Sequence, residues 1–469
     1  MKVCVVLPRS ADDDGEAVQP DVANYIDREV HSVQTKLIRR EHAIEDIDDL
    51  EIGNFDVFIN YLPLNLEWIE TLRYLNTKYL FGIGTVPDFA LDLYAASKES
   101  AKASEISYQL GSMLPSCGRS FQDGDYAVLV VLFGQTPYAL TPLSAGGDNE
   151  VKWTWAPQSE LSEQLRATAV STFRQIRASH EYLGYLGINL HVAKDSAAIT
   201  VINVDLAPRL FYAQGVSPLD DLIARTIPGG HAAFFEILLS TRLARVPHYT
   251  LRNQGCARQH DRLARLYYTI LDSTNVTYNR LSPFVGKYDY NGTVLDCCSG
   301  SGEFARFATE NGVKAKFTAL DYSVEMTKLP CSKKLYEQPF IIGPVQEVLS
   351  SAPIHDHVVC FGSLHLLQPF DFVSTISQMF LRAAKSVTFD VDDLSQTYIR
   401  NFPDASSEKC WEKLEYNHNH VATIFRFRTP VGWKAVVHGE RRYAYHSLVM
   451  DEDVYTYSFR FEKVVGSVV

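Results

Sequence analysis

The segment over residues 293–307 constrains the fold of this chain more than any other. It begins as an apolar strand that ends in Asp296, continues through small residues that include Gly300 and Gly302, and then takes on the pattern of a helix start. Glycines let the backbone come close to a ligand, and the first turn of a helix offers unpaired N–H groups. The pattern predicts a ligand-binding loop, with a tight strand–helix turn as the plain alternative.

A second strand favours the ligand-binding loop. Residues 315–321 form another apolar run that ends in an acid, Asp321, 25 positions after Asp296. An acid at the end of the second strand of a nucleotide-binding sheet can accept hydrogen bonds from both hydroxyls of a ribose. The loop after Asp296 contains only G-x-G, so the dinucleotide fingerprint G-x-G-x-x-G is incomplete.

Strands alternate with helices in two regions of the chain. The first region starts at Met1 and the second at Gly292, and a polar, Arg-rich stretch over 245–262 lies between them. We interpret this stretch as a linker, which a leading helix over 263–285 follows. The fold class is therefore α/β with two domains, 1–250 and 251–469, and ligands are expected beyond the carboxyl ends of the strands.

Composition excludes several classes of protein. The 469 residues are 46% hydrophobic, which excludes wholesale disorder, and the net charge of −12 argues against a general nucleic-acid binder. The longest apolar run, 126–133, is far shorter than the roughly 18 residues of a membrane span, and the first residues indicate a strand and not a signal peptide. The eight cysteines show no zinc spacing, so we expect reduced thiols, no metal and a cytoplasmic protein.

Two segments carry a family resemblance. VLDCCSGSGEFA (294–305) and ALDYSVEM (319–326) resemble the first two motifs of class I S-adenosylmethionine (SAM)-dependent methyltransferases. Cys298 stands where the family has a glycine, and Pro344 stands where the family often has an aspartate, which Gln346 or a backbone group would replace. The resemblance continues through 356–367, 385–391 and 457–466 and covers about 263–469.

The resemblance implies a Rossmann-like sheet and SAM as the cofactor. It assigns cofactor binding to Asp296, Cys298, Gly300, Gly302, Asp321, Tyr322, Met326, Gln346, Phe361 and Gly362. His365, in the loop after the expected fourth strand, is the best-placed candidate for a catalytic base, which a hydroxyl acceptor would need and an amine would not.

A β-rich insert is expected before the last strands. Runs over 420–428 and 433–445 flank a Pro/Gly turn, which predicts a hairpin. In related methyltransferases such an insert caps the substrate cavity, so Arg442, Tyr443 and Tyr445 are candidate substrate-binding residues. A plain hairpin with a solvated basic face is the alternative.

The first half of the chain resembles D-alanine–D-alanine ligases of the ATP-grasp superfamily. The resemblance rests on the order of the segments 54–61, 79–98, 124–142 and 199–208. Asn189 and Asn203 stand where that family has metal-binding acids, so that only Asp205 is left. Only 21 residues separate Lys102 from Gly124, where the family has a whole nucleotide-clamping sheet. These departures predict a degenerate ligase-like shell, kept for substrate recognition or dimerisation.

The sequence therefore predicts a SAM-dependent methyltransferase that acts on a small molecule, with an amine, amino acid or peptide-like acceptor favoured and a biosynthetic role. No nucleic-acid or membrane partner is expected, and a homodimer through the N-terminal domain is left open. Two alternatives are kept: an ATP-dependent carboxylate–amine ligase with an accessory methyltransferase, and a binding protein that has lost both activities.

Overall fold

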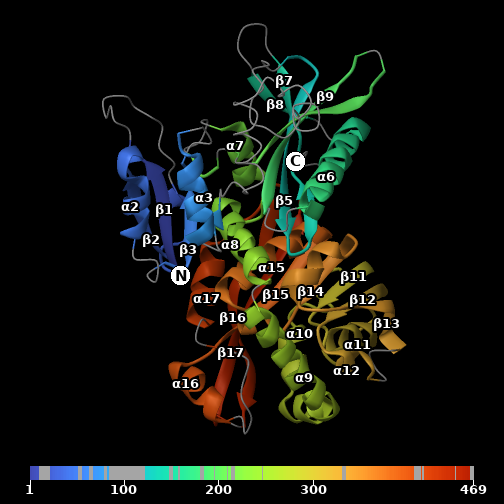
Figure 1. The fold of residues 1–469 in the computed structure, drawn as a ribbon. Coiled ribbons are helices and arrows are strands. Elements are labelled where there is room, and N and C mark those ends of the chain that lie inside the picture. The colour runs from blue at the N-terminus through green and yellow to red at the C-terminus, as the bar shows by residue number, and fades with distance from the viewer. Residues whose placement is uncertain are drawn as a thin grey trace. The chain divides into compact units, whose positions relative to one another are not determined.

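The computed structural model divides into two compact units, which are described separately (Figure 1). Unit 1 comprises Met1–Leu132 and Pro137–Thr226, and unit 2 comprises Phe133–Thr136 and Ile227–Val469. The structure describes residues 1–9, 22–50, 55–62, 67–78, 82–83, 122–146, 152–156, 159–179, 184–194, 196–206, 208, 210–212, 217–245, 247–329, 334–405, 414, 417–448 and 450–464.

Unit 1 begins with a four-stranded parallel sheet in the order β2-β1-β3-β4. Its strands are β1 (Lys2–Pro8), β2 (Ser32–Ile38), β3 (Val57–Asn60) and β4 (Gly82–Ile83), and its helices are α1 (Val22–Tyr25), α2 (Ala43–Asp48) and α3 (Ile69–Lys78). The central strand β1 is almost wholly apolar, and Val6 packs with Ile47 and Leu72 in the core. Both faces of a parallel sheet are covered in this way because its crossover connections are helices.

A six-stranded antiparallel sheet follows, in the order β10-β9-β5-β7-β8 with β6 paired to β5. Its strands are β5 (Asp125–Phe133), β6 (Thr136–Ala139), β7 (Leu143–Gly146), β8 (Lys152–Trp155), β9 (Tyr185–Val192) and β10 (Ile199–Asp205). The helices of this region are α6 (Glu160–Ser179) and α7 (Pro218–Thr226). The predicted strand segments 54–61, 124–142 and 199–208 thus contain β3, β5 with β6, and β10.

Unit 2 is built on a seven-stranded sheet in the order β13-β12-β11-β14-β15-β17-β16. The strands β11 (Gly292–Cys297), β12 (Ala315–Asp321), β13 (Tyr336–Ile342), β14 (His355–Cys360) and β15 (Ala383–Asp393) are parallel, whereas β16 (Trp433–Ser447) and β17 (Glu452–Lys463) are antiparallel. The strand order reverses between β11 and β14, and ligands of such sheets bind at that reversal. The predicted α/β class is therefore confirmed.

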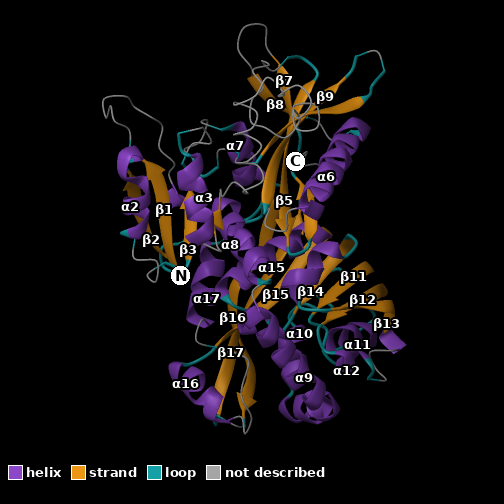
Figure 2. Cartoon of the chain, viewed as in Figure 1, coloured by secondary structure: helices purple, strands orange, loops and turns teal. Residues whose placement is uncertain are grey.

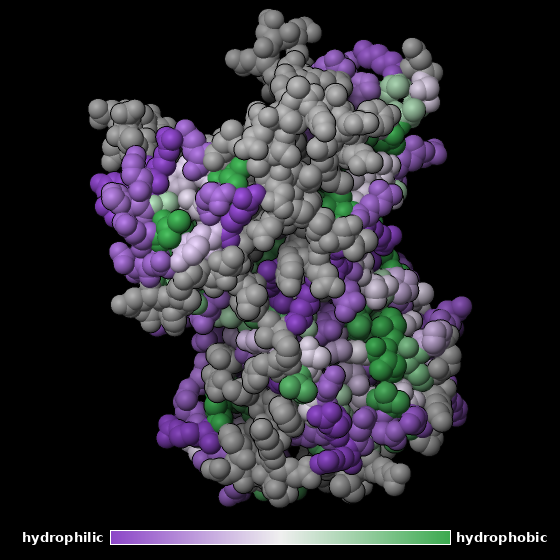
Figure 3. Space-filling view, viewed as in Figure 1, coloured by the Kyte–Doolittle hydropathy of each residue, from purple (hydrophilic) through white to green (hydrophobic). Residues whose placement is uncertain are grey.

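Three of the described helices of unit 2 precede its first strand in sequence, and the others lie between the strands (Figure 2, with helices in purple and strands in orange). They are α8 (Gly230–Leu243), α9 (Pro247–Thr274), α10 (Val276–Leu281), α11 (Glu303–Glu310), α12 (Val324–Thr327), α14 (Val345–Val348), α15 (Pro369–Arg382), α16 (Gln396–Ala405) and α17 (Asn417–Arg426). Figure 3 shows apolar residues in small groups among hydrophilic ones on the visible face. Within the described residues no single helix is long and apolar enough to cross a membrane. The bent pair α7 and α8 reaches the required length and apolar composition only when the two helices are taken together.

The stretch over 245–262, expected to be a linker, is largely helical and forms the first half of α9. Its Leu, Arg, Gln and Ala residues are good helix formers, and Pro247 occupies the first helical position, where a proline is tolerated. The predicted domain boundary at residue 250 therefore lies inside a helix.

The predicted hairpin over 420–445 is also wrong in its first arm. Residues 417–426 form α17, with Asn417, His420 and Ile424 buried at helical spacing. The second arm is β16, which pairs with β17 at the edge of the main sheet and forms no separate lid. Two of the three buried residues of α17 are polar, so the apolar pattern of the sequence does not reveal the buried face of this helix.

Candidate functional site

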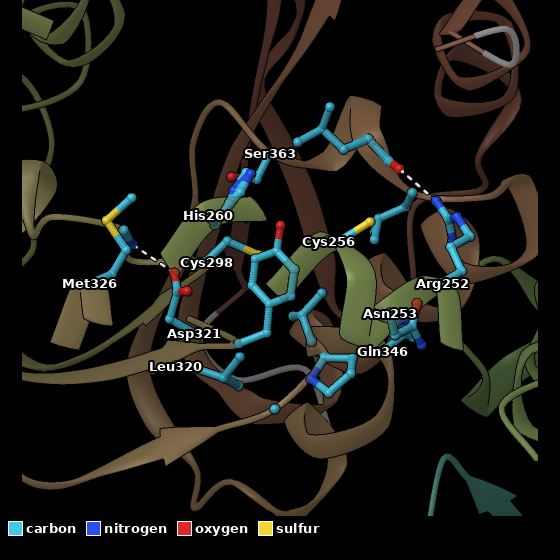
Figure 4. A pocket seen from close by; sticks show the side chains of 17 residues that line it. Arg252, Asn253, Cys256, His260, Cys298, Leu320, Asp321, Met326, Gln346 and Ser363 are labelled. Atoms are coloured by element: carbon cyan, nitrogen blue, oxygen red, sulfur yellow. Dashed lines mark hydrogen bonds between the residues drawn. The ribbon is translucent and has the colours of Figure 1, made fainter. Parts of the chain in front are cut away.

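A pocket in unit 2 lies at the carboxyl ends of the parallel strands (Figure 4). Cys298 and Gly300 line it from the loop after β11, and Asp321 lines it from the end of β12. Ser363 and Leu366 line it from the loop after β14. Asp321 and Leu320 lie on one side of the pocket in Figure 4, and His260 and Ser363 lie on the other. The sheet thus brings together residues that are up to 68 positions apart, as the parallel arrangement predicts.

Asp321 is buried at the end of β12, where two hydrogen bonds hold its carboxylate in one orientation. The Gly300 amide donates to its Oδ2 at 2.8 Å, and the Ser323 amide donates to its Oδ1 at 2.8 Å. Burial raises the pKa of Asp321 to about 6, although these backbone donors act in the opposite direction. Each carboxylate oxygen can accept more than one hydrogen bond, so both oxygens retain acceptor capacity for a diol.

The turn after β11 carries the strain that a glycine would relieve. Cys298 has a φ of +55°, and Gly300 and Gly302 also have positive φ. A non-glycine residue in the left-handed region costs about 1–2 kcal/mol, which is a physical reason for the family to use glycine at this point. The Cys298 thiol lines the pocket, and together with burial it raises the pKa of the Cys360 thiol on β14.

Two predicted members of the first motif lie outside the pocket lining. Gly302 is the N-cap residue of α11. Asp296 is buried and accepts a hydrogen bond from the Tyr336 hydroxyl, and burial raises its pKa to about 7. The structure therefore places Asp296 in the packed interior beside the loop.

The pocket lining also includes an aromatic side chain and an amide side chain. Tyr322 and Met326 follow β12, and the Tyr322 ring lies 5.2 Å from the imidazole of His260. Pro344 and Gln346 line the pocket from the turn after β13. Gln346, which was predicted to replace the missing aspartate, thus belongs to the pocket lining.

Helix α9 supplies a wall that the sequence reasoning missed. Its residues Arg252, Asn253, Cys256 and His260 line the pocket. Asn253 donates to Glu347 at 3.0 Å, Arg252 donates to the Leu366 carbonyl at 3.3 Å, and burial lowers the pKa of His260 to about 4. The spacing of 252, 256 and 260 places them on one helical face. That spacing is the signal in the sequence that points to this wall, whereas the polar composition of the segment favours a linker.

The remaining cofactor candidates, Phe361 and Gly362, are not among the residues that line the pocket. The Phe361 ring packs 5.6 Å from Phe284 and 5.5 Å from Phe304. The Gly362 amide donates to Asp390 at 2.7 Å. Phe361 therefore belongs to the apolar core, and Gly362 connects the loop to β15.

His365 lies in the short 3-10 turn η4 (Leu364–Leu366), between the lining residues Ser363 and Leu366. Its Nε2 lies 3.7 Å from Oδ2 of Asp392 on β15. Burial lowers the pKa of His365, which Asp392 opposes. A buried neutral imidazole beside a carboxylate is suited to accept a proton.

Of the predicted substrate residues, only Tyr445 is near this histidine. Its ring lies 5.7 Å from the Arg280 guanidinium, which pairs with Asp392. Arg442 pairs with Glu440 on the same strand, and Tyr443 is 41% exposed and packs against Tyr455. None of the three lines the pocket, because β16 is the outermost strand of the sheet.

In unit 1, Asn189 on β9 and Asn203 on β10 are direct partners across the antiparallel pair, and Asp205 lies opposite Gly187. The predicted metal-site remnant is thus assembled with a single acid. Lys102, and the segment 79–98 apart from Gly82 and Ile83, lie outside the described residues. In the part of the chain that the structure describes, no three His, Cys, Asp or Glu side chains form a group suited to a metal ion.

No protein-family model and no curated protein matches this chain. Similar solved structures include magnesium protoporphyrin IX methyltransferase (ChlM) from Synechocystis PCC 6803 with bound SAH, which is 13% identical. That match covers 44% of this chain and 86% of the other, with a TM-score of 0.27. The plantazolicin methyltransferase BpumL with SAH is 14% identical over 48% of this chain and 94% of its own, with a TM-score of 0.27.

The similar solved structures also include ligases. D-alanine–D-alanine ligase from Bacillus anthracis complexed with ATP is 10% identical over 52% of this chain and 97% of its own, with a TM-score of 0.35. The chain is thus similar to solved structures of both families that its motifs resemble, each over about half of its length.

Proposed function

We propose that unit 2 binds SAM and transfers its methyl group to a small molecule, with an amine, amino acid or peptide-like acceptor favoured. The observation that carries this function is Asp321, whose carboxylate is held by two backbone amides at the mouth of the pocket. Its free acceptor capacity fits a ribose diol, and Gly300 and Tyr322 line the same pocket.

The lining residues fit the whole cofactor. Asp321 would hold the ribose, Tyr322 and Met326 would pack against the adenine, and Cys298 and Gly300 would face the methionine part. Gln346 and Asn253 offer the amide groups that Pro344 lacks for the adenine amine. The backbone at Cys298 is strained and its thiol takes up space beside the pocket, but Cys298 is one of the lining residues and does not fill the pocket.

Bound SAM would supply a methyl group already activated on a sulfonium, so the chain's own residues have to position the acceptor and exclude water. Helix α9 covers the pocket and performs the second task. His365 would accept a proton from the acceptor, since it is buried, and its lowered pKa keeps it neutral near pH 7.

The function predicts that the full chain binds S-adenosylhomocysteine. Asp321→Ala is expected to weaken binding by about 1.5–3 kcal/mol, the usual value for a hydrogen bond to a charged group, and Asp321→Asn by less, because the amide still accepts one bond. Isothermal titration calorimetry measures both. Glu337→Gln, which removes an exposed carboxylate on the neighbouring strand β13, is the matched control.

An unchanged dissociation constant in Asp321→Ala would contradict the ribose site.

For unit 1, we propose a ligase-like shell that does not turn over ATP, supported by the single acid among Asn189, Asn203 and Asp205. We also propose that unit 1 takes part in substrate recognition or dimerisation and that the protein serves a biosynthetic pathway in the cytoplasm.

A further inference from the structure

We propose, as an extension of the methyl transfer proposed above, that Arg280, Asp390, Asp392 and His365 form the acceptor subsite of unit 2. We name these four residues the Arg280 cluster. The acceptor class that fits the cluster is an organic amine that arrives as an ammonium cation and gives a proton to His365.

The Arg280 cluster is a fully buried set of charged groups. Asp390 and Asp392 are each 1% exposed, and Arg280 and His365 are each 8% exposed. Nη1 of Arg280 lies 2.6 Å from Oδ2 of Asp390, and its Nη2 lies 2.8 Å from Oδ2 of Asp392. One guanidinium is thus shared between two carboxylates.

The charges of the cluster do not balance. With both carboxylates ionised, two negative charges face one guanidinium and a neutral imidazole. Burial accordingly raises the pKa of Asp390, whereas at Asp392 the Arg280 charge and hydrogen bonds together outweigh burial and lower the pKa. The other titratable groups that face the cluster are the Cys360 thiol on β14 and the Tyr445 hydroxyl on β16. The neighbouring Cys298 thiol and burial raise the pKa of Cys360, and burial raises the pKa of Tyr445, so both stay neutral. A ligand that brings one positive charge completes the cluster, since buried charges persist only when they are paired.

The geometry of His365 leaves one nitrogen for the ligand. Its Nε2 faces the carboxylate of Asp392, so the ring proton is assigned to Nε2 and the lone pair to Nδ1. Nδ1 is buried and has no hydrogen-bond partner among the described residues. Such an unpaired buried acceptor needs a donor, which an ammonium N–H provides.

The cluster adjoins the cofactor pocket and an aromatic wall. His365 lies between Ser363 and Leu366, which both line the pocket, and the Gly362 amide donates to Asp390. Leu366, Tyr398 and Tyr445 all pack against one apolar cluster, which consists of Leu394, Leu414 and Val454. These two rings offer a surface for the organic part of an amine and for its positive charge.

The resulting step balances in atoms and charge. The ammonium gives a proton to Nδ1 of His365 and becomes a neutral amine. Its nitrogen lone pair then forms the bond to the methyl carbon while the carbon–sulfur bond breaks, and that electron pair stays on sulfur. The positive charge moves from sulfur to the methylated nitrogen, which lies beside Asp390 and Asp392.

Benzylamine is a suitable probe, with benzyl alcohol as its uncharged counterpart. The full chain, saturated with S-adenosylhomocysteine, is titrated with each at pH 7.5 in a calorimeter. We expect benzylamine to bind at least tenfold more tightly than benzyl alcohol, about 1.4 kcal/mol. Asp390→Asn should remove that preference, whereas Asp393→Asn, which alters a carboxylate outside the cluster on the same strand, should retain it.

Equal affinity for the amine and the alcohol in the wild-type chain overturns the acceptor assignment, and so does an amine preference that survives in Asp390→Asn. If Asp390→Asn does not fold, the wild-type protein with ¹³C-labelled histidine decides: the His365 signal, assigned with His365→Gln, should shift with benzylamine and not with benzyl alcohol. Absence of S-adenosylhomocysteine binding refutes the methyltransferase proposal instead, and the same two titrations of the SAH-free protein still test the charge of the cluster.

Discussion

The backbone at Cys298 allows the cofactor loop to be tested without touching its charged groups. Its φ of +55° costs an L-residue about 1–2 kcal/mol. A glycine removes this cost and adds about 0.5–1 kcal/mol of chain entropy to the unfolded state. Since Cys298→Ala also removes the thiol but keeps the Cβ, the difference between the two variants isolates the backbone term. We expect Cys298→Gly to be about 0.5–1 kcal/mol more stable than Cys298→Ala.

Two measurements check this expectation. Urea denaturation at equal protein concentration compares the free energy of unfolding of the two variants. Calorimetry with S-adenosylhomocysteine compares their affinity with the wild-type value, which Cys298→Gly should equal or exceed, because the family pattern is restored and the loop gains room.

A glycine variant that is no more stable than the alanine variant would show that the left-handed turn is not strained. A folded Cys298→Gly protein that binds tenfold more weakly, about 1.4 kcal/mol, would show that the loop has adapted to the thiol. Absence of S-adenosylhomocysteine binding in both the wild-type chain and the variant favours the alternative of a binding protein that has lost both activities.

Three further outcomes are expected. The affinity for S-adenosylhomocysteine should fall as the pH drops through about 6, because Asp321, with a pKa of about 6, is then protonated. Calorimetry at pH 5 and pH 8 should show this fall in the wild type and a much smaller one in Asp321→Asn. Asp296→Asn should raise the free energy of unfolding by up to about 4 kcal/mol at pH 8. The pKa of Asp296 is about 7 in the folded chain and 3.8 ordinarily, so its ionisation opposes folding above about pH 4. Denaturation at pH 5 should therefore show a smaller gain in stability than at pH 8. Mg-ATP should not raise the melting temperature, and a saturable rise that Asp205→Ala abolishes would contradict the degenerate ligase shell.

The pocket was predictable where its residues are local to a strand end. The motif residues Cys298, Gly300 and Asp321 follow β11 and β12 directly, and parallel strands bring their carboxyl ends to one edge of a sheet. Tyr322 and Gln346 were predicted from the same resemblance and also line the pocket.

The wall formed by α9 and the fold of 417–426 were not predicted. Polar composition suggested a linker in the first case, and a β-rich run beside a Pro/Gly turn suggested a strand in the second. Both segments are helices whose buried faces are set by the elements that they contact, and such contacts override weak local preferences.

The sequence by itself determined the α/β class, the strand ends with their acids, and the glycine turn, because each depends on neighbouring residues and on the period of apolar side chains. Only the tertiary structure decided that Asp296 points into the interior and that Arg280 lies between Asp390 and Asp392. The last association joins residues 110 and 112 positions apart. No local pattern encodes it, because a buried ion pair is selected by the packing of helix α10 against strands from distant parts of the chain.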